Sequence, residues 1–111
     1  MLPIRTRLLG AEHPHTLRTR YSLAQSLGRG GDPAAARELT EELLTDQSRA
    51  LGAEHPHTLR TRYNLAHWTG AAGDPEAQRA ALVTLLEDQV RILGPDHPDT
   101  GLTRQALAGG G

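Results

Sequence analysis

The sequence predicts an all-α protein, an α-solenoid of antiparallel helix pairs with two full repeats and flanking helix fragments. The first reason is repetition: LGAEHPHTLRTRY occurs at residues 9–21 and again, letter for letter, at residues 51–63. A diverged copy, LGPDHPDTGLTR, runs over residues 93–104, so the period is 42 residues. The second reason is composition. A chain with no Phe, one Trp and two Tyr must build its interior from Leu and Ala, which favour helices over strands.

Each copy contains a His-Pro dipeptide at which one helix of a pair is expected to begin. The residue before a proline is disfavoured in the α conformation, so His13, His55 and His97 are expected to be non-helical. Proline itself suits the first position of a helix, where no backbone N–H is needed. The sequence therefore predicts helices over residues 14–27, 56–71 and 98–107.

A Gly-Asp-Pro corner marks the start of the other helix of each pair. GRGGDP at residues 28–33 matches GAAGDP at residues 70–75. Asp32 or Asp74 can cap the following helix, whose first position is then a proline. A glycine follows the end of each of these helices and is a common C-terminal stop. Helices are therefore predicted over residues 33–51 and 75–93.

Apolar residues recur on one face of each predicted helix, at spacings of three and four residues. The inner faces are expected to contain Leu17, Leu23, Ala24 and Leu27; then Ala36, Leu39, Leu43, Leu44, Ala50 and Leu51; then Leu59, Leu65, Ala66 and Trp68; and finally Ala81, Leu82, Leu85, Leu86, Ile92 and Leu93, with Gln89 interrupting the last stripe.

The chain is expected to form one domain with an incomplete repeat at each side. Residues 1–9 end in RTRLLG, which aligns with QSRALG and QVRILG and resembles the tail of a preceding helix. Repeat 1 then covers residues 10–51, repeat 2 residues 52–93, a partial repeat residues 94–108, and a glycine tail residues 109–111. Two repeats are fewer than a solenoid usually needs, and Leu85, Leu86 and Ile92 are expected to have little cover. We therefore expect self-association with another copy, by end-to-end stacking or helix exchange.

The sequence YNLA at residues 63–66, then GD at 73–74, a long helix and LGPDHPDT resembles the 42-residue variety of tetratricopeptide repeat. That variety occurs in kinesin light chains and in bacterial arrays, often beside signalling ATPase modules of the STAND type. The resemblance covers nearly the whole chain and implies a stack of helix pairs that binds a protein or peptide partner. Two positions depart from the family: Arg62 replaces a large apolar residue, and Thr69 replaces a Tyr. A HEAT-type helical repeat has a compatible period and stays the structural alternative.

Composition and spacing argue against several other classes of function. The net charge is −1, with both signs interspersed, so no surface for nucleic acid is indicated. The chain has no Cys, no Ser with His and Asp partners at a recognisable spacing, and no phosphate-binding P-loop. We expect no enzyme activity, no catalytic residues and no cofactor. No apolar run approaches a membrane span, and the expected compartment is the cytoplasm. The acidic cluster Glu38, Glu41, Glu42 and Asp46 is interpreted as a solvated face.

The repeated EHPH motif raises the question of a metal site. A zinc site needs three or four ligands that converge on one ion, whereas two His on either side of a Pro tend to diverge. The positive end of a helix dipole also disfavours a cation, and the third copy has Asp99 in place of the second His. The motif is therefore interpreted as a structural corner. A metal-sensing or regulatory module based on these histidines is the alternative function, and a purely structural piece of a longer sensor array is a third.

One polar face remains after the core and the corners are assigned. In tetratricopeptide arrays the first helix of each pair lines a concave groove, and the resemblance places two sets of residues at its peptide-contacting positions. The predicted groove residues are Arg18, Tyr21, Ser22 and Gln25 on the first such helix, and Arg60, Tyr63, Asn64 and His67 on the second. The competing interpretation is that Tyr21 and Tyr63 pack between repeats. The function predicted from these residues is a protein-interaction scaffold without chemistry of its own.

Overall fold

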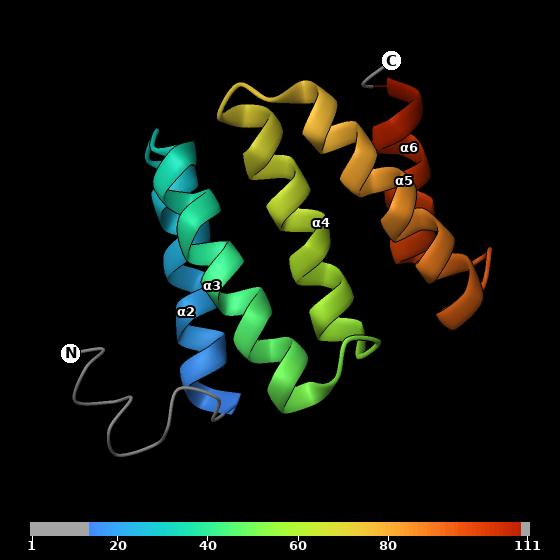
Figure 1. The fold of residues 1–111 in the computed structure, drawn as a ribbon, viewed down its shortest axis with the longest axis horizontal. Helices are drawn as coiled ribbons and strands as arrows, with labels where there is room; N and C mark the ends of the chain where they lie inside the picture. The colour runs from blue at the N-terminus through green and yellow to red at the C-terminus, as the bar shows by residue number, and fades with distance from the viewer. Residues whose placement is uncertain (1–13, 110–111) are drawn as a thin grey trace.

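The structure, a computed structural model, describes residues 14–109, with side chains from Thr16 onward. This part of the chain is helical and contains no strand. Its helices are α2 (Pro14–Arg29), α3 (Pro33–Leu51), α4 (Pro56–Ala71), α5 (Pro75–Ile92) and α6 (Pro98–Gly109). Each helix packs against the next one along the chain, and the series forms a single layered stack (Figure 1). The all-α prediction is confirmed, and the predicted helix ends differ by at most two residues. The predicted helix tail over residues 1–9 lies outside the described residues.

The two Gly-Asp-Pro corners begin α3 and α5 as predicted. Asp32 accepts a hydrogen bond from the backbone N–H of Ala35 at 3.1 Å, and Asp74 accepts one from Ala77 at 3.1 Å. These bonds satisfy backbone donors that the first turn of a helix leaves without a partner. Glycines with positive φ (100° and 107°) directly precede the two aspartates and turn the chain.

The His-Pro corners begin α4 and α6, and at both corners the histidine side chain also accepts a hydrogen bond from the first turn of the helix. The backbone of His55 is extended, and its Nδ1 accepts a hydrogen bond from the backbone N–H of His57 at 3.0 Å. His97 Nδ1 does the same for the N–H of Asp99, also at 3.0 Å. An imidazole nitrogen thus caps each helix in the role that Ser, Thr, Asp and Asn usually fill. The sequence predicted the corner but not this cap.

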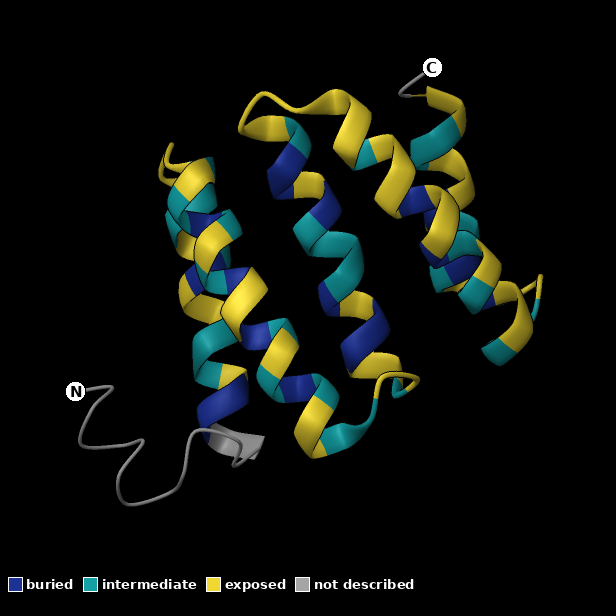
Figure 2. Ribbon diagram, viewed as in Figure 1, coloured by how far each residue is buried: buried dark blue, intermediate teal, exposed yellow. Residues whose placement is uncertain are grey.

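The core contains leucines but also many threonines, so the expected Leu and Ala interior is only partly right. The buried face of each helix is turned toward its neighbours (Figure 2). The buried apolar residues are Leu17, Ala24, Ala36, Leu43, Leu59, Ala66, Trp68, Leu82 and Leu85; the buried polar residues are Thr16, Thr40, Gln47, Thr58, Thr61, Thr69, Gln89, Thr100 and Thr103. Thr61 and Thr69 donate to backbone carbonyls four residues earlier, which lets a hydroxyl be buried inside the stack.

The expected burial was wrong at four residues. Leu23, assigned to the inner face of α2, is 37% exposed. Leu85, expected to have little cover, is 1% exposed because α5 lies between α4 and α6, which both pack against it. Ala50 and Ala81 were assigned to the inner faces and are exposed. A spacing of three and four residues defines a face, but the width of the buried part depends on how closely each neighbouring helix approaches.

Partly buried ion pairs link the two helices of each repeat. Arg62 Nη1 donates to Asp88 Oδ2 at 2.7 Å, linking α4 to α5. The pair recurs 42 residues earlier as Arg20 and Asp46, which meet at 2.6 Å and link α2 to α3. The hydrogen bond from the Arg62 guanidinium holds the pKa of Asp88 below its ordinary value of 3.8. Asp46 is therefore not part of a solvated acidic face, as the sequence suggested, because it holds two helices together.

Candidate functional site

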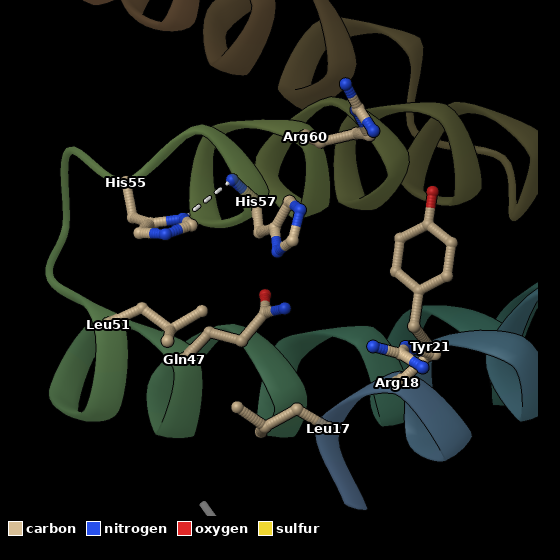
Figure 3. A pocket seen from close by; sticks show the side chains of 8 residues that line it. All are labelled: Leu17, Arg18, Tyr21, Gln47, Leu51, His55, His57 and Arg60. Atoms are coloured by element: carbon tan, nitrogen blue, oxygen red, sulfur yellow. Dashed lines mark hydrogen bonds between the residues drawn. The ribbon is translucent and has the colours of Figure 1, made fainter. Parts of the chain in front are cut away.

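A groove of about 430 Å³ lies between α2, α3 and the beginning of α4 (Figure 3). Within the described chain its wall is formed by Leu17, Arg18, Tyr21, Gln47, Leu51, His55, His57 and Arg60. The close view shows the amide of Gln47 and the imidazole of His57 pointing toward each other across the hollow, with Tyr21 at one end. Leu17 and Leu51 provide an apolar part of the wall. A side chain from outside can thus meet both apolar and polar groups in the groove.

The lining of the groove contains several basic side chains. Two arginines and two histidines belong to its lining, and no Asp or Glu does among the residues that the structure describes. The Nδ1 of His55 already accepts the capping hydrogen bond, so in the neutral ring the proton lies on Nε2. That N–H remains a potential donor toward a ligand. The arrangement suits hydrogen-bond acceptors and anions better than cations.

The two arginines differ in their partners. Arg60 Nη2 donates to Asp99 Oδ2 at 3.3 Å, an ion pair between α4 and α6. Arg18 is exposed and makes no hydrogen bond or ion pair with any other residue in the described part of the chain. The guanidinium of Arg18 is therefore available to a partner without breaking an internal contact.

The structure brings only part of the predicted groove residues together. Arg18, Tyr21 and Arg60 line the groove. Ser22 and His67 are exposed outside its lining, and Tyr63 is half-buried on α4.

Two of the remaining predicted residues connect the repeats instead. Asn64 Nδ2 donates to the hydroxyl of Tyr21 at 2.6 Å, and Trp68 Nε1 donates to Gln25 Oε1 at 3.2 Å. Both bonds join α4 to α2. Tyr21 therefore has two roles, since its ring borders the groove while its hydroxyl holds the next repeat in register.

Sequence reasoning missed five residues of the groove. Leu17 was assigned to the core, and His55 and His57 only to a corner. Gln47 and Leu51 come from α3, which the family resemblance did not place at the groove. The spacing between helices determines whether the second helix of a pair reaches the hollow, and no single-sequence pattern reports that spacing. One signal in the sequence pointed to His55 and His57 as groove residues. Both lie at the corner between two helices that are predicted to be neighbours.

The histidines do not form a metal cluster in the described structure. No three His, Cys, Asp or Glu side chains of the described residues lie close enough together to hold an ion. The rings of His55 and His57 have centroids 5.0 Å apart. The side chains of His13 and His15 lie outside the described part. None of the described helices is long and apolar enough to span a lipid bilayer.

Comparison with known proteins identifies the repeat. The family model described as tetratricopeptide repeat matches residues 16–57 and, directly after them, residues 58–99. Two solved structures of a Podosopora anserina protein, described as a kinesin light chain with nearly identical TPR-like repeats, superpose on the chain with TM-scores of 0.86 and 0.85; one carries a single substitution. Each is 28% identical to the chain and is matched over 98% of it. The chain spans about half of their length, 51% and 52%. No curated protein matches the sequence.

Proposed function

Because the chain belongs to the tetratricopeptide repeat family, we propose that it is a non-catalytic interaction module whose groove binds an extended segment of a partner protein. Repeats of this family mediate protein–protein interactions. The finer statement, that the segment is bound between α2 and the beginning of α4, rests on the groove described above.

The observation that carries the proposal is the meeting of Arg18, Tyr21 and Arg60 at one open hollow. Tyr and Arg are enriched among residues that dominate binding energy at protein interfaces. A groove of about 430 Å³ has room for a few side chains and not for a folded domain, so the ligand is a segment of chain. Leu17 and Leu51 supply apolar surface, and the guanidinium and imidazole groups supply directional contacts.

The test is a selection from a library of random displayed peptides, followed by affinity measurements on the selected sequences. We expect the Arg18→Ala, Arg60→Ala double variant to weaken binding by about 1–2 kcal/mol per anchor while its thermal melt stays close to that of the wild type. Arg29→Ala is the matched control, because Arg29 is an exposed arginine of α2 outside the groove lining.

Two outcomes would contradict the proposal. The first is full binding by a folded Arg18→Ala, Arg60→Ala variant, which would move the site away from the groove. The second is a selection in which no peptide binds at the groove.

Self-association stays a separate prediction. Leu102 and Val90 expose apolar surface, at 50% and 37%. The molar mass in solution, measured by light scattering over a range of concentrations, tests it.

A further inference from the structure

The two kinds of corner in this protein cap their helices with different chemical groups. At the Gly-Asp-Pro corners the acceptor is a carboxylate, Asp32 for α3 and Asp74 for α5. At the His-Pro corners it is the Nδ1 atom of an imidazole, His55 for α4 and His97 for α6. A carboxylate stays ionised down to about pH 4, whereas an imidazole loses its single acceptor when it takes up a proton, ordinarily at about pH 6.5. The corners therefore differ in the pH range over which their caps can form.

We propose that the imidazole caps are an acid-sensitive device, which holds the first turns of α4 and α6 while His55 and His97 are neutral and releases these turns when the two rings are protonated. In the protonated ring, Nδ1 carries a hydrogen and faces the backbone N–H from which it had accepted, so two donors oppose each other. The added charge also lies at the positive end of the helix dipole, where a cation is unfavourable. The stabilisation by each cap is thus present in the neutral ring and is lost as the pH falls.

The charged groups around the α4 cap make protonation of His55 more costly. His57 lies beside it, with the ring centroids 5.0 Å apart. Arg18 of α2 and Arg60 of α4 line the same groove. The phenol of Tyr21 and uncharged side chains of α2 and α3 complete the described lining. An imidazolium at His55 therefore has cationic groups as its neighbours across the groove.

One carboxylate lies next to the α4 cap in the sequence, and it already has a partner. Glu54 accepts a hydrogen bond from Arg91 of α5 at 3.0 Å, and both side chains are exposed. Its charge is thus compensated by a guanidinium and screened by solvent, which leaves little attraction for an imidazolium at His55. Acid should therefore act on the start of α4.

The α6 cap has the opposite surroundings. Asp96 precedes His97, and Asp99 follows in the first turn, where it accepts from Arg60 of α4 at 3.3 Å. Arg104 of the same helix donates to a backbone carbonyl of this corner at 2.8 Å. At the two positions that correspond to the α3 side of the groove, α5 carries uncharged residues. Carboxylates close to the ring favour its charged form, so acid should destabilise the start of α6 less than the start of α4.

Acid acts through the α4 cap on the wall of the groove. His55 and His57 both belong to the lining, and the capping bond joins these two residues at its edge (Figure 3). Release of the first turn changes this part of the wall, whereas the parts that α2 and α3 contribute do not depend on the bond. The caps hold the helix starts whether or not the groove binds a segment, so the device can be tested independently of the proposed function.

The ring nitrogens provide the first test. Long-range NMR spectra that correlate the ring hydrogens with the ring nitrogens distinguish a protonated nitrogen from an unprotonated one. At about pH 8 we expect His55 and His97 to carry their hydrogen on Nε2 and none on Nδ1. A hydrogen on Nδ1 of either ring under these conditions would overturn the proposal, because that ring could not accept the capping bond.

A titration from about pH 8 to about pH 5.5 provides the second test, in a range where the aspartate caps stay ionised. As the rings are protonated, the amide signals of His57 and Asp99 should move toward those of an uncapped chain. The capped population should fall by about tenfold for each further unit of pH. The amides of Ala35 and Ala77 are the internal controls and should not move, because aspartates hold them.

Two results of the titration would contradict the proposal. If the amides held by the aspartates change together with those held by the histidines, the whole fold responds to acid and the caps are not the sensitive element. If the amide of His57 does not change while the ring of His55 is protonated, the bond between them contributes nothing to the start of α4.

The matched variant replaces the titrating acceptor with one that does not titrate. His55→Asn keeps a side-chain oxygen for the cap, so the protein should stay folded. The first turn of α4 should then no longer respond to pH between about 8 and 5.5, while the first turn of α6 still does. His67→Asn, at an exposed histidine of α4 that caps no helix, should leave both responses unchanged. An undiminished response of the α4 turn in His55→Asn would show that another group carries it and would overturn the assignment to the imidazole.

Discussion

The indole ring of Trp68 occupies the space beside the α-carbon of Gly28, where any other residue would place a side chain. Trp68 is 7% exposed, and its Nε1 donates to Gln25 on the same helix α2. The residue 42 positions before Trp68 is Ser26, so this contact is made only at the junction between α2 and α4 and is not a property of every repeat. It fixes the second repeat against the first by shape, next to the hydrogen bond between Asn64 and Tyr21.

Gly28→Ala is therefore expected to destabilise the protein. A Cβ at Gly28 would collide with the ring of Trp68, and overpacking of this kind costs about 1–3 kcal/mol of the free energy of unfolding. Gly70→Ala is the matched control, since a Cβ there meets the flexible end of Gln78 and gains helix propensity of about 1 kcal/mol. Chemical denaturation measures both. If Trp68→Leu does not relieve the effect of Gly28→Ala, the collision is not its cause.

Thr58→Val is expected to raise stability. The hydroxyl of Thr58 is buried and has no hydrogen-bond partner in the described structure. Valine keeps the shape and removes an unsatisfied polar group, which should increase the free energy of unfolding by about 1 kcal/mol. Thr61→Val is the comparison, because the Thr61 hydroxyl donates to the His57 carbonyl at 3.1 Å and its removal should bring no gain. Equal melting temperatures for the two variants would contradict the account.

His55→Ala should lower stability by about 0.5–2 kcal/mol, the usual cost of removing a helix cap. The reason is the bond from the His57 N–H to His55 Nδ1, which an alanine cannot accept. His55→Asn is the rescue variant, because its side-chain oxygen can accept from the same turn. A thermal melt in which the asparagine variant is as weak as the alanine variant would show that the imidazole contributes through packing rather than capping.

The pair of Asp88 and Arg62 gives stability a specific dependence on pH. The pKa of Asp88 is held below 3.8, first of all by the hydrogen bond from Arg62, so the folded state favours the ionised form. The pair contributes its full stabilisation of the fold above about pH 4. This contribution disappears as the pH falls through the pKa that Asp88 has in the folded state, which is the lower of its two values. Asp88→Asn should lose about 0.5–1 kcal/mol at neutral pH, since the pair is partly exposed.

Asp88→Asn should also make the free energy of unfolding depend less on pH. The values for the variant and for the wild type should converge at low pH. Urea denaturation between pH 7 and pH 2.5 tests this. Glu87→Gln, a change at an exposed neighbour on α5, serves as the control. A constant difference between Asp88→Asn and the wild type at all pH values would refute the linkage.

The fold was predictable because its signals are local and repeated. The 42-residue period, the prolines at helix starts and the glycines before the corners each specify backbone geometry through stereochemistry. The burial of Thr58 and the exposure of Leu23 were not predictable, because both depend on how closely neighbouring helices approach.

The groove was predicted only through its arginines and Tyr21. Their helical spacing places them on a face, but the contribution of Gln47 and His57 arises from contacts between elements that lie far apart in the sequence. The difference between His57 and Asp99 was visible in the sequence. Its meaning required the ion pair between Asp99 and Arg60 to be seen.

The threonine-rich interior affects how the protein responds to temperature. Unfolding exposes the hydroxyls of buried residues such as Thr61 and Thr103 and the amide of Gln89 together with the leucines. Apolar surface raises the heat capacity of the unfolded chain, and polar surface lowers it. The heat-capacity change per residue should therefore fall below the usual value of about 12–15 cal/mol/K. A small heat-capacity change flattens the stability curve, so the unfolding enthalpy measured by calorimetry should change little with temperature.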